Sequence, residues 1–290
     1  MASVADWIEG ARPRTLPAAV APVLLGTGAA AQVGAASLPR ALLAAGVALA
    51  LQVGVNYAND YSDGVRGTDE FRTGPQRLTG GGLAAPGRVR AAALASLGVA
   101  GVLGLVLVAL AGQWWLLAVG ALCVLAAWGY TGGARPYGYL GLGEVFVFVF
   151  FGLVATLGTT WTQAATLPWT AWVAAVGVGL IACALLMVNN IRDIPTDVPA
   201  GKRTVAVRLG DRRARRTYVA MVALPLALGA ACAIAAPWSL LVLALVPLAW
   251  RCCAPVLRGA AGRDLVVVLR DTGLLELGYG LLLGAGLALA

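Results

Sequence analysis

The sequence predicts an all-α, polytopic membrane protein, and three observations support this fold class. Hydrophobic residues make up 60% of the 290 residues, charged residues 12%, and the mean hydropathy is +0.84. A soluble domain is nearer half apolar and a quarter charged. The apolar residues form long runs, each close to the ~20 residues that a spanning helix needs. The linkers between the runs alternate strictly between nearly uncharged and rich in arginine.

Nine transmembrane helices fit this pattern, and we expect residues 1–290 to form a single transmembrane domain around a central cavity. The first run is not interpreted as a cleaved signal peptide, because Asp6 and Glu9 precede it and it continues without a clear stop. A short interfacial segment around Trp7 comes before it. The predicted spans are 15–33, 38–58, 91–111, 113–130, 141–162, 168–190, 218–236, 238–254 and 271–289.

The charge of the linkers predicts the orientation of the chain in the cell (plasma) membrane. The basic residues lie almost entirely in four of them: 59–90, 131–140, 191–217 and 255–270. By the positive-inside rule these linkers are cytoplasmic, with the N-terminus inside and the C-terminus outside. We expect them to cap the cavity, with short helices around Gly87–Ala93 and Val205–Arg216. The net charge of +8 then reflects topology and lipid headgroup contacts, as in the run 212–216, and indicates no nucleic-acid partner.

The residue types narrow the metal chemistry that is available to this chain. The sequence has five cysteines without a CxxC spacing and no histidine. Thiolate or imidazole metal sites and disulfides are therefore not expected. Any bound metal would be a hard ion with oxygen ligands, such as Mg²⁺.

An Asn-Asp-Asp pattern occurs twice, each time where an apolar run ends. In VNYANDYSDGVRGTD the three residues stand at i, i+4 and i+7, and in VNNIRDIPTDVPAGKR at i, i+4 and i+8. Either spacing places them near one face of a helix. Because both copies fall on the charged side, two such faces turned toward each other would form a mouth lined by carboxylates and amides. The residues are Asn56, Asp60, Asp63, Asn189, Asp193 and Asp197.

The acid content of these two segments favours a cation site. Six of the 13 acidic residues lie in them, with Asp69 and Glu70 following the first copy. Carboxylates at one depth of a membrane are costly, and close ones do not all stay ionised without a counter-charge. Acids at helix ends can also set topology or cap helices. Two matched copies at one membrane face favour the cation instead.

Basic residues beside the acids predict a phosphate ligand. Mg²⁺ held by a few carboxylates usually also holds substrate phosphates. Lys202 is the only lysine among the 21 basic residues, and it follows the second copy. A diphosphate neutralised by Mg²⁺ and these cations becomes a good leaving group, and an allylic one would leave a carbocation in the apolar cavity. The neighbouring cations are Arg66, Arg72, Arg77, Arg192, Lys202 and Arg203.

Five segments make the chain resemble a known family. They are RPRTLPAAVAPVLLG (12–26), NYANDYSDGVRGTD (56–69), the nearby Gly74, Pro75, Arg77 and Leu78, RPYGYLGLGE (135–144) and NNIRDIPTDVPAGKRTVAVRLG (189–210). On these motifs the chain resembles the UbiA superfamily of intramembrane prenyltransferases. Within it, the chain is most similar to the 1,4-dihydroxy-2-naphthoate polyprenyltransferases of menaquinone biosynthesis. Beyond residue 210 the match is one of hydropathy only.

The resemblance implies a Mg²⁺-dependent reaction between two substrates in the bilayer. A polyprenyl diphosphate would alkylate 1,4-dihydroxy-2-naphthoate, with loss of CO₂ and diphosphate, to give demethylmenaquinone. Two alternatives are a UbiA-type enzyme with another aromatic acceptor, such as 4-hydroxybenzoate, and an ion-coupled transporter. Transporter acids should lie near the bilayer midplane, whereas these acids lie at span ends. The sequence predicts neither the prenyl chain length nor the oligomeric state.

The resemblance also implies roles for individual residues. Its first motif is often written with three residues between two aspartates, but here only two separate Asp60 from Asp63, so Asp63 and Asp69 compete to complete the metal shell. Glu144 is either a functional intramembrane acid or a stabiliser of its helix start. The implied metal ligands are Asp60, Asp63, Asp69, Asp193 and Asp197, and the two Asn-Asp-Asp copies are the catalytic set. The implied ligands of the diphosphate or acceptor carboxylate are Arg14, Arg66, Arg72, Arg135, Tyr137, Lys202 and Arg203. Arg14 has an alternative role as a topological anchor. Arg135 and Tyr137 have an alternative role as parts of an interfacial turn.

Overall fold

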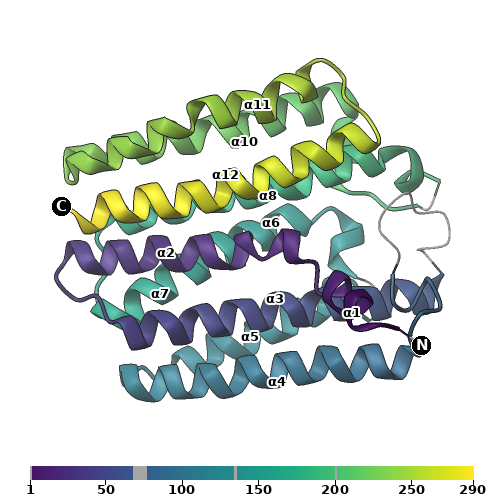
Figure 1. Ribbon diagram of the computed structural model, residues 1–290, viewed down its shortest axis with the longest axis horizontal. Helices are drawn as coiled ribbons and strands as arrows, with labels where there is room; N and C mark the ends of the chain where they lie inside the picture. The colour runs from purple at the N-terminus through teal and green to yellow at the C-terminus, as the bar shows by residue number, and fades with distance from the viewer. Residues whose placement is uncertain (1, 68–76, 134–135, 200) are drawn as a thin grey trace.

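The protein is a bundle of long helices that lie side by side (Figure 1). The computed structural model describes residues 2–67, 77–133, 136–199 and 201–290, and this part of the chain contains no β-strand. Six helices are long and apolar enough to cross a membrane, or seven if the segments Val4–Thr15 and Pro17–Gln32, bent by 47°, form one span. The all-α, polytopic membrane fold is thus confirmed. The two termini lie at opposite ends of the bundle (Figure 1).

The helices follow the predicted order of the spans. The first part of the chain forms α1 (Val4–Gly10), the 3₁₀ turn η1 (Pro13–Thr15), α2 (Pro17–Gln32), α3 (Leu38–Arg66), α4 (Pro86–Ala111) and α5 (Leu116–Gly129). The middle part forms η2 (Tyr137–Leu140), α6 (Gly143–Val147), η3 (Phe148–Val154), α7 (Ala155–Ala164) and α8 (Trp169–Asp197). The last part forms α9 (Val205–Leu209), α10 (Asp211–Ala231), η4 (Cys232–Ile234), η5 (Pro237–Leu245), α11 (Val246–Leu257) and α12 (Arg263–Ala288).

Both helices that carry the Asn-Asp-Asp copies extend past their predicted spans. α3 continues to Arg66 and α8 to Asp197, so that each copy is helical throughout. The apolar runs end earlier, but the polar residues that follow them do not interrupt the helix. Hydropathy marks where a helix leaves the apolar layer, not where it ends.

The short helices predicted within the charged linkers differ from those observed. The segment around Gly87–Ala93 is the start of α4 rather than a separate helix. The segment Val205–Arg216 is divided between α9 and α10. Gly210 separates the two helices because its φ of +71° lies in the left-handed region, which ends α9 before α10 begins. The basic run 212–216 therefore lies in the first turns of α10.

The predicted span 141–162 contains an irregular centre. α6 and α7 are joined by the π-helix η3, Phe148–Val154. A π-helical segment adds a residue to the turn and redirects the side chains that follow, and such segments are frequent at functional sites. Phe150 and Phe151, both in η3, line the cavity described below.

Small residues allow the helices on one side of the bundle to pack closely. α2 contacts α12 where Gly28 meets Gly284 and Ala21 meets Gly280. Added side-chain carbons at these glycines would lie within 3 Å of the facing backbone. Small residues at such crossings are typical of membrane helix pairs. The main buried core lies on this side, among α2, α8, α10, α11 and α12, whereas α3, α4 and α5 form the other side.

Candidate active site

A cavity of about 1140 Å³ lies between the two sides of the bundle. One end of it is polar and is lined by residues from α1, α3, η2 and α8. The rest is apolar, with Leu107, Val119, Phe150 and Val154 among its lining residues. On α3 the lining face runs from Ala44 to Asp63, which corresponds to roughly 28 Å at ~1.5 Å per residue. The cavity thus joins a charged chamber to a long apolar arm.

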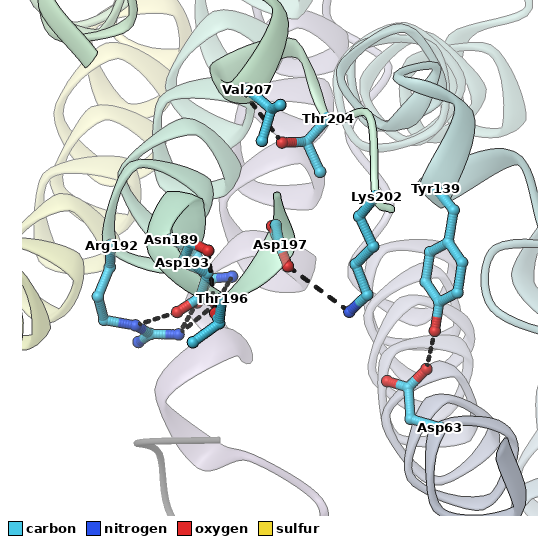
Figure 2. A network of polar contacts seen from close by, with 10 residues as sticks. All are labelled: Asp63, Tyr139, Asn189, Arg192, Asp193, Thr196, Asp197, Lys202, Thr204 and Val207. Atoms are coloured by element: carbon cyan, nitrogen blue, oxygen red, sulfur yellow. Dashed lines mark hydrogen bonds and ion pairs between the residues drawn. The ribbon is translucent and has the colours of Figure 1, made fainter. Parts of the chain in front are cut away.

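Both Asn-Asp-Asp copies line the polar end of this cavity. All six side chains, Asn56, Asp60, Asp63, Asn189, Asp193 and Asp197, are among its lining residues. Figure 2 shows Asp193 and Asp197 on one side and Asp63 with Tyr139 on the other, with Lys202 between them. The two helix faces predicted from the spacing therefore face one cavity.

Asp60, in the first copy, is held by backbone N–H groups. Its Oδ2 accepts a hydrogen bond from Leu78 N at 2.9 Å, and its Oδ1 accepts one from Thr79 N at 2.8 Å. The side chain is fully buried within the protein. Two neutral donors stabilise the carboxylate without cancelling its charge. Asp60 thus ties α3 to the segment before α4.

The other two residues of the first copy bond to different parts of the chain. Asp63 Oδ1 accepts a 2.6 Å hydrogen bond from the hydroxyl of Tyr139. Asn56 Nδ2 donates to the carbonyl of Ala11 at 2.8 Å and to Thr15 Oγ1 at 3.1 Å. Asn56 therefore positions the N-terminal segment against the cavity.

The second copy is paired with cations. Arg192 donates to both oxygens of Asp193, from Nε to Oδ1 at 2.7 Å and from Nη2 to Oδ2 at 2.8 Å, and Nη2 also donates to Asn189 Oδ1 at 2.8 Å. Lys202 Nζ lies 3.7 Å from Asp197 Oδ1. A planar fork on a carboxylate is a strong, charge-assisted arrangement. The negative charge of this copy is therefore largely neutralised.

Tyr139 connects the two copies. Its hydroxyl bonds Asp63, its ring lies 4.8 Å from Lys202 Nζ, and its carbonyl accepts a hydrogen bond from Arg203 N at 3.0 Å. The ammonium group gains from the ring face through a cation–π contact. The η2 segment and the loop after α8 thus meet at Tyr139 and Lys202, which both line the cavity (Figure 2).

The predicted basic residues fall into three groups. Four of them line the cavity: Arg14, Arg77, Arg192 and Lys202. Arg14 Nη2 lies 3.9 Å from Glu9 Oε1. Arg66 and Arg203 do not line it: Arg66 donates to the carbonyls of Thr131 and Gly133, and the side chain of Arg203 is exposed. Three predicted site residues lie outside the described residues: Asp69, Arg72 and Arg135.

Tyr137 lines the cavity as part of an aromatic wall. Its ring stacks on Phe146 with 3.9 Å between centroids, and its hydroxyl donates to the carbonyl of Ala126 at 2.7 Å. Burial raises the pKa of this phenol above its ordinary value. Tyr137 therefore stays protonated near neutral pH and acts as a hydrogen-bond donor, not as a base.

Two polar residues that line the cavity, Asn190 and Gln52, were not predicted as part of the site. Asn190 lines the cavity and donates from Nδ2 to Oε1 of the buried Glu144 at 3.1 Å. Glu144 does not line the cavity and lies in the first turn of α6, a position that fits its expected role as a stabiliser of the helix start. Gln52 donates to Thr15 Oγ1 at 2.9 Å, one helical turn before Asn56. The i−4 spacing of Gln52 from Asn56 was the signal that could have revealed it.

The carboxylates suit a hard cation by donor type and by location, but they do not form a preassembled cluster. Within the described ranges no three Asp, Glu, Cys or His side chains gather closely enough to hold a metal ion. Each aspartate of the two copies bonds another group of the protein. All four nevertheless present oxygen donors to one cavity, and oxygen is what Mg²⁺ prefers.

Comparisons with known proteins agree with this geometry. Residues 19–263 match the UbiA prenyltransferase family. The 1,4-dihydroxy-2-naphthoate octaprenyltransferase of Mycobacterium tuberculosis is 54% identical over 288 residues, which cover 99% of this chain and 98% of the relative. The enzyme of the same name from Mycobacterium leprae is 51% identical over 290 residues, or 100% and 98% of the two chains. A UbiA homolog from Archaeoglobus fulgidus, solved bound to GPP and Mg²⁺, superposes with a TM-score of 0.65 at 16% identity, covering 97% of this chain and 99% of its own.

Proposed function

The chain belongs to the UbiA prenyltransferase family, and from this premise we propose that it transfers a polyprenyl group to 1,4-dihydroxy-2-naphthoate in menaquinone biosynthesis. The donor is a polyprenyl diphosphate, and the products are demethylmenaquinone at the quinol level, CO₂ and diphosphate. The naphthoate acceptor follows from relatives of that name at 51% and 54% identity along essentially the whole chain. The geometric observation that carries the proposal is the single cavity with an acidic and basic end and a long apolar arm.

The bonds that change in this reaction match the two parts of the cavity. The allylic C–O bond breaks, and its electron pair leaves with the diphosphate at the polar end. The ring carbon that bears the carboxylate forms a bond to the allylic carbon. The bond to the carboxylate then breaks, CO₂ leaves, and its electron pair restores the aromatic ring. The apolar wall of Phe146, Phe150 and Phe151 keeps water from the cation while this happens.

Asp60, Asp63, Asp193 and Asp197 are the proposed ligands of Mg²⁺, with Asp69 as an alternative to Asp63. When bound, Mg²⁺ would neutralise the charge that develops on the departing diphosphate. The oxygen donors in one cavity support this assignment, as does the A. fulgidus homolog that was solved with GPP and Mg²⁺.

The cations of the second copy have a separate task. Arg192 and Lys202 neutralise Asp193 and Asp197 before substrate arrives. The diphosphate then competes with the aspartates for these cations, and the released guanidinium and ammonium groups bind its oxygens. Arg14 also lines the cavity beside Glu9, and in this proposal it binds the carboxylate of the acceptor.

We propose that the chain crosses the plasma membrane nine times as a single domain. The nine spans are α2, α3, α4, α5, α6–α7, α8, α10–η4, η5–α11 and α12. The charged loops lie on the cytoplasmic side with the N-terminus, and the C-terminus lies outside. The positions of the termini at opposite ends of the bundle support an odd number of crossings (Figure 1).

The test is to identify the product by mass spectrometry. Purified protein in liposomes would receive labelled polyprenyl diphosphate, Mg²⁺ and either 1,4-dihydroxy-2-naphthoate or 4-hydroxybenzoate. We expect a prenylated, decarboxylated naphthalene product. Prenyl transfer to 4-hydroxybenzoate alone would reassign the acceptor, and substrate-dependent ion flux without a product would favour a transporter.

A further inference from the structure

The hairpin of α11 and α12 carries a patch of four exposed arginines that the proposed reaction does not use. Arg251 and Arg258 are seven residues apart on α11 and its C-terminal cap, and Arg263 and Arg270 are seven apart on α12. Seven residues make about two helical turns, so that each pair lies on one face of its helix. None of the four lines the cavity. We call these four residues the arginine patch.

The two inner arginines are fixed on one buried carboxylate. Arg251 Nε donates to Asp271 Oδ2 at 2.8 Å, and Arg270 Nη2 donates to Asp271 Oδ1 at 2.9 Å. The side chain of Asp271 is 3% exposed, whereas those of Arg251 and Arg270 are 61% and 56% exposed. Each guanidinium has five N–H groups, and this contact uses only one or two of them. Asp271 therefore holds two guanidinium groups at the surface, and each of them retains N–H donors that this contact does not use.

The patch lies near one end of the bundle, on a face with an apolar border. Arg251 and Arg270 are each roughly 10 Å from the loop that joins α11 to α12, at ~1.5 Å per residue. That loop is at the same end of the bundle as the N-terminus (Figure 1). Trp250, Val267 and Leu274 are exposed beside the inner arginines. A surface that mixes exposed apolar groups with arginine is typical of the boundary between acyl chains and headgroups.

The charge of the patch is positive after its acids are counted. Its four arginines oppose Asp264 and Asp271, which leaves a charge of +2. Arg215 of α10 donates to the carbonyls of Val256 and Ala260, so the basic run of α10 is tied to the same hairpin. The positive-inside rule accounts for the arginines at the loop. Arg251 and Arg270 differ from the loop arginines because a buried acid holds them about two turns within the helices.

We propose that the arginine patch binds the phosphate headgroup of an anionic phospholipid. Guanidinium forks bind phosphate through paired N–H donors, and basic pockets between membrane helices recognise anionic headgroups in this way. A bound lipid would hold α11 against α12, and α12 in turn packs on α2 and α8. The proposal concerns a surface away from the cavity and does not depend on the substrate of the enzyme.

The experiment is a lipid-binding measurement on the full chain. Native mass spectrometry would count phosphatidylglycerol and phosphatidylcholine on delipidated protein as each lipid is added. We expect the wild type to bind phosphatidylglycerol at least about 10-fold more tightly, and Arg251→Gln/Arg270→Gln to lose this preference. The matched control is Arg88→Gln/Arg90→Gln, which removes the same charge from exposed positions at the start of α4. It should behave as the wild type does.

A second variant keeps the test independent of folding. Arg258→Gln/Arg263→Gln leaves both partners of Asp271 in place, and we expect it to weaken phosphatidylglycerol binding severalfold. Inorganic phosphate at millimolar concentration should not displace the lipid, because it lacks acyl chains. Three results would each overturn the proposal: equal binding of the two lipids by the wild type, unchanged binding by both patch variants, or an equal loss in the α4 control.

Discussion

The two Asn-Asp-Asp copies have similar spacing but different partners. In α3 the first aspartate, Asp60, accepts from the backbone N–H groups of Leu78 and Thr79. In α8 its counterpart, Asp193, forms a bidentate ion pair with Arg192. The partners of the first aspartate are neutral, whereas the partner of the second is a cation. A duplicated motif therefore does not imply a duplicated environment.

The difference suggests a division of labour within one site. A carboxylate held by neutral donors remains available to a hard cation. A carboxylate paired with a cation must exchange that partner before it binds a metal, and the exchange frees the cation for an anionic substrate. We infer that the α3 copy presents charge for Mg²⁺, while the α8 copy holds its cations ready for the diphosphate.

The largest loss of prenyl transfer activity is expected from removing Asp60 or Asp193, the first aspartate of each copy. Asp60→Ala and Asp193→Ala should each lower Mg²⁺-dependent prenyl transfer by about 10³-fold or more, because both copies serve one reaction. The measurement is product formation in liposomes. The exposed Asp264 is the matched control, and Asp264→Ala should retain activity. Near wild-type turnover by either cavity variant would contradict the shared site.

A smaller loss of activity is expected from a substitution of Lys202, a cation paired with the second copy. Lys202→Gln should reduce kcat/KM for the polyprenyl diphosphate by roughly 10²-fold, since one donor to the departing diphosphate is lost. Lys202→Arg retains the charge and should recover part of the loss. Steady-state kinetics with the donor varied would measure both. If Lys202→Gln were as active as wild type, the exchange of partners at Asp197 would have no role.

The contacts of Tyr139, which join the two copies, should contribute less to activity than the aspartates of either copy. Tyr139→Phe removes the hydroxyl that donates to Asp63 but keeps the ring beside Lys202. Hydrogen bonds to charged groups contribute about 1.5–3 kcal/mol, and the lower end of this range corresponds to a loss of activity of roughly 10-fold. Tyr139→Ala removes the ring as well and should lose more. Equal activity of the two variants would show that the cation–π contact adds nothing.

The smallest change in activity is expected from a substitution in the apolar arm of the cavity, which both copies share. Gly158 lies on a cavity-lining stripe of η3 and α7, and a side chain there would meet no atom within 4 Å. Gly158→Leu should lower kcat/KM for long donors by roughly 5-fold to 10-fold more than for short ones. Competition between donors of different length, read by mass spectrometry, measures the ratio. Gly101→Leu on α4 is the control, because it has similar space but does not line the cavity.

The sequence was a good guide to which helix faces line the cavity. It was a poorer guide to the hydrogen-bond partner of each side chain. The i, i+4 spacing of Asn56 and Asp60 is local, so it indicated one helix face, and that face lines the cavity. The bond from Tyr139 to Asp63 joins residues 76 positions apart, and local periodicity carries no information on such pairs. The π-helix at Phe148–Val154 was not predicted either, since its phenylalanines fit an ordinary apolar span.

The central claim, that both copies build one diphosphate site, is tested most directly by binding without catalysis. Thermal stability of the purified protein would be followed with Mg²⁺, with inorganic diphosphate and with both. We expect the two together to stabilise the wild type, and Asp60→Asn and Asp193→Asn each to abolish this joint effect. Joint stabilisation of wild-type size in either single variant would contradict the claim, because one copy would then suffice.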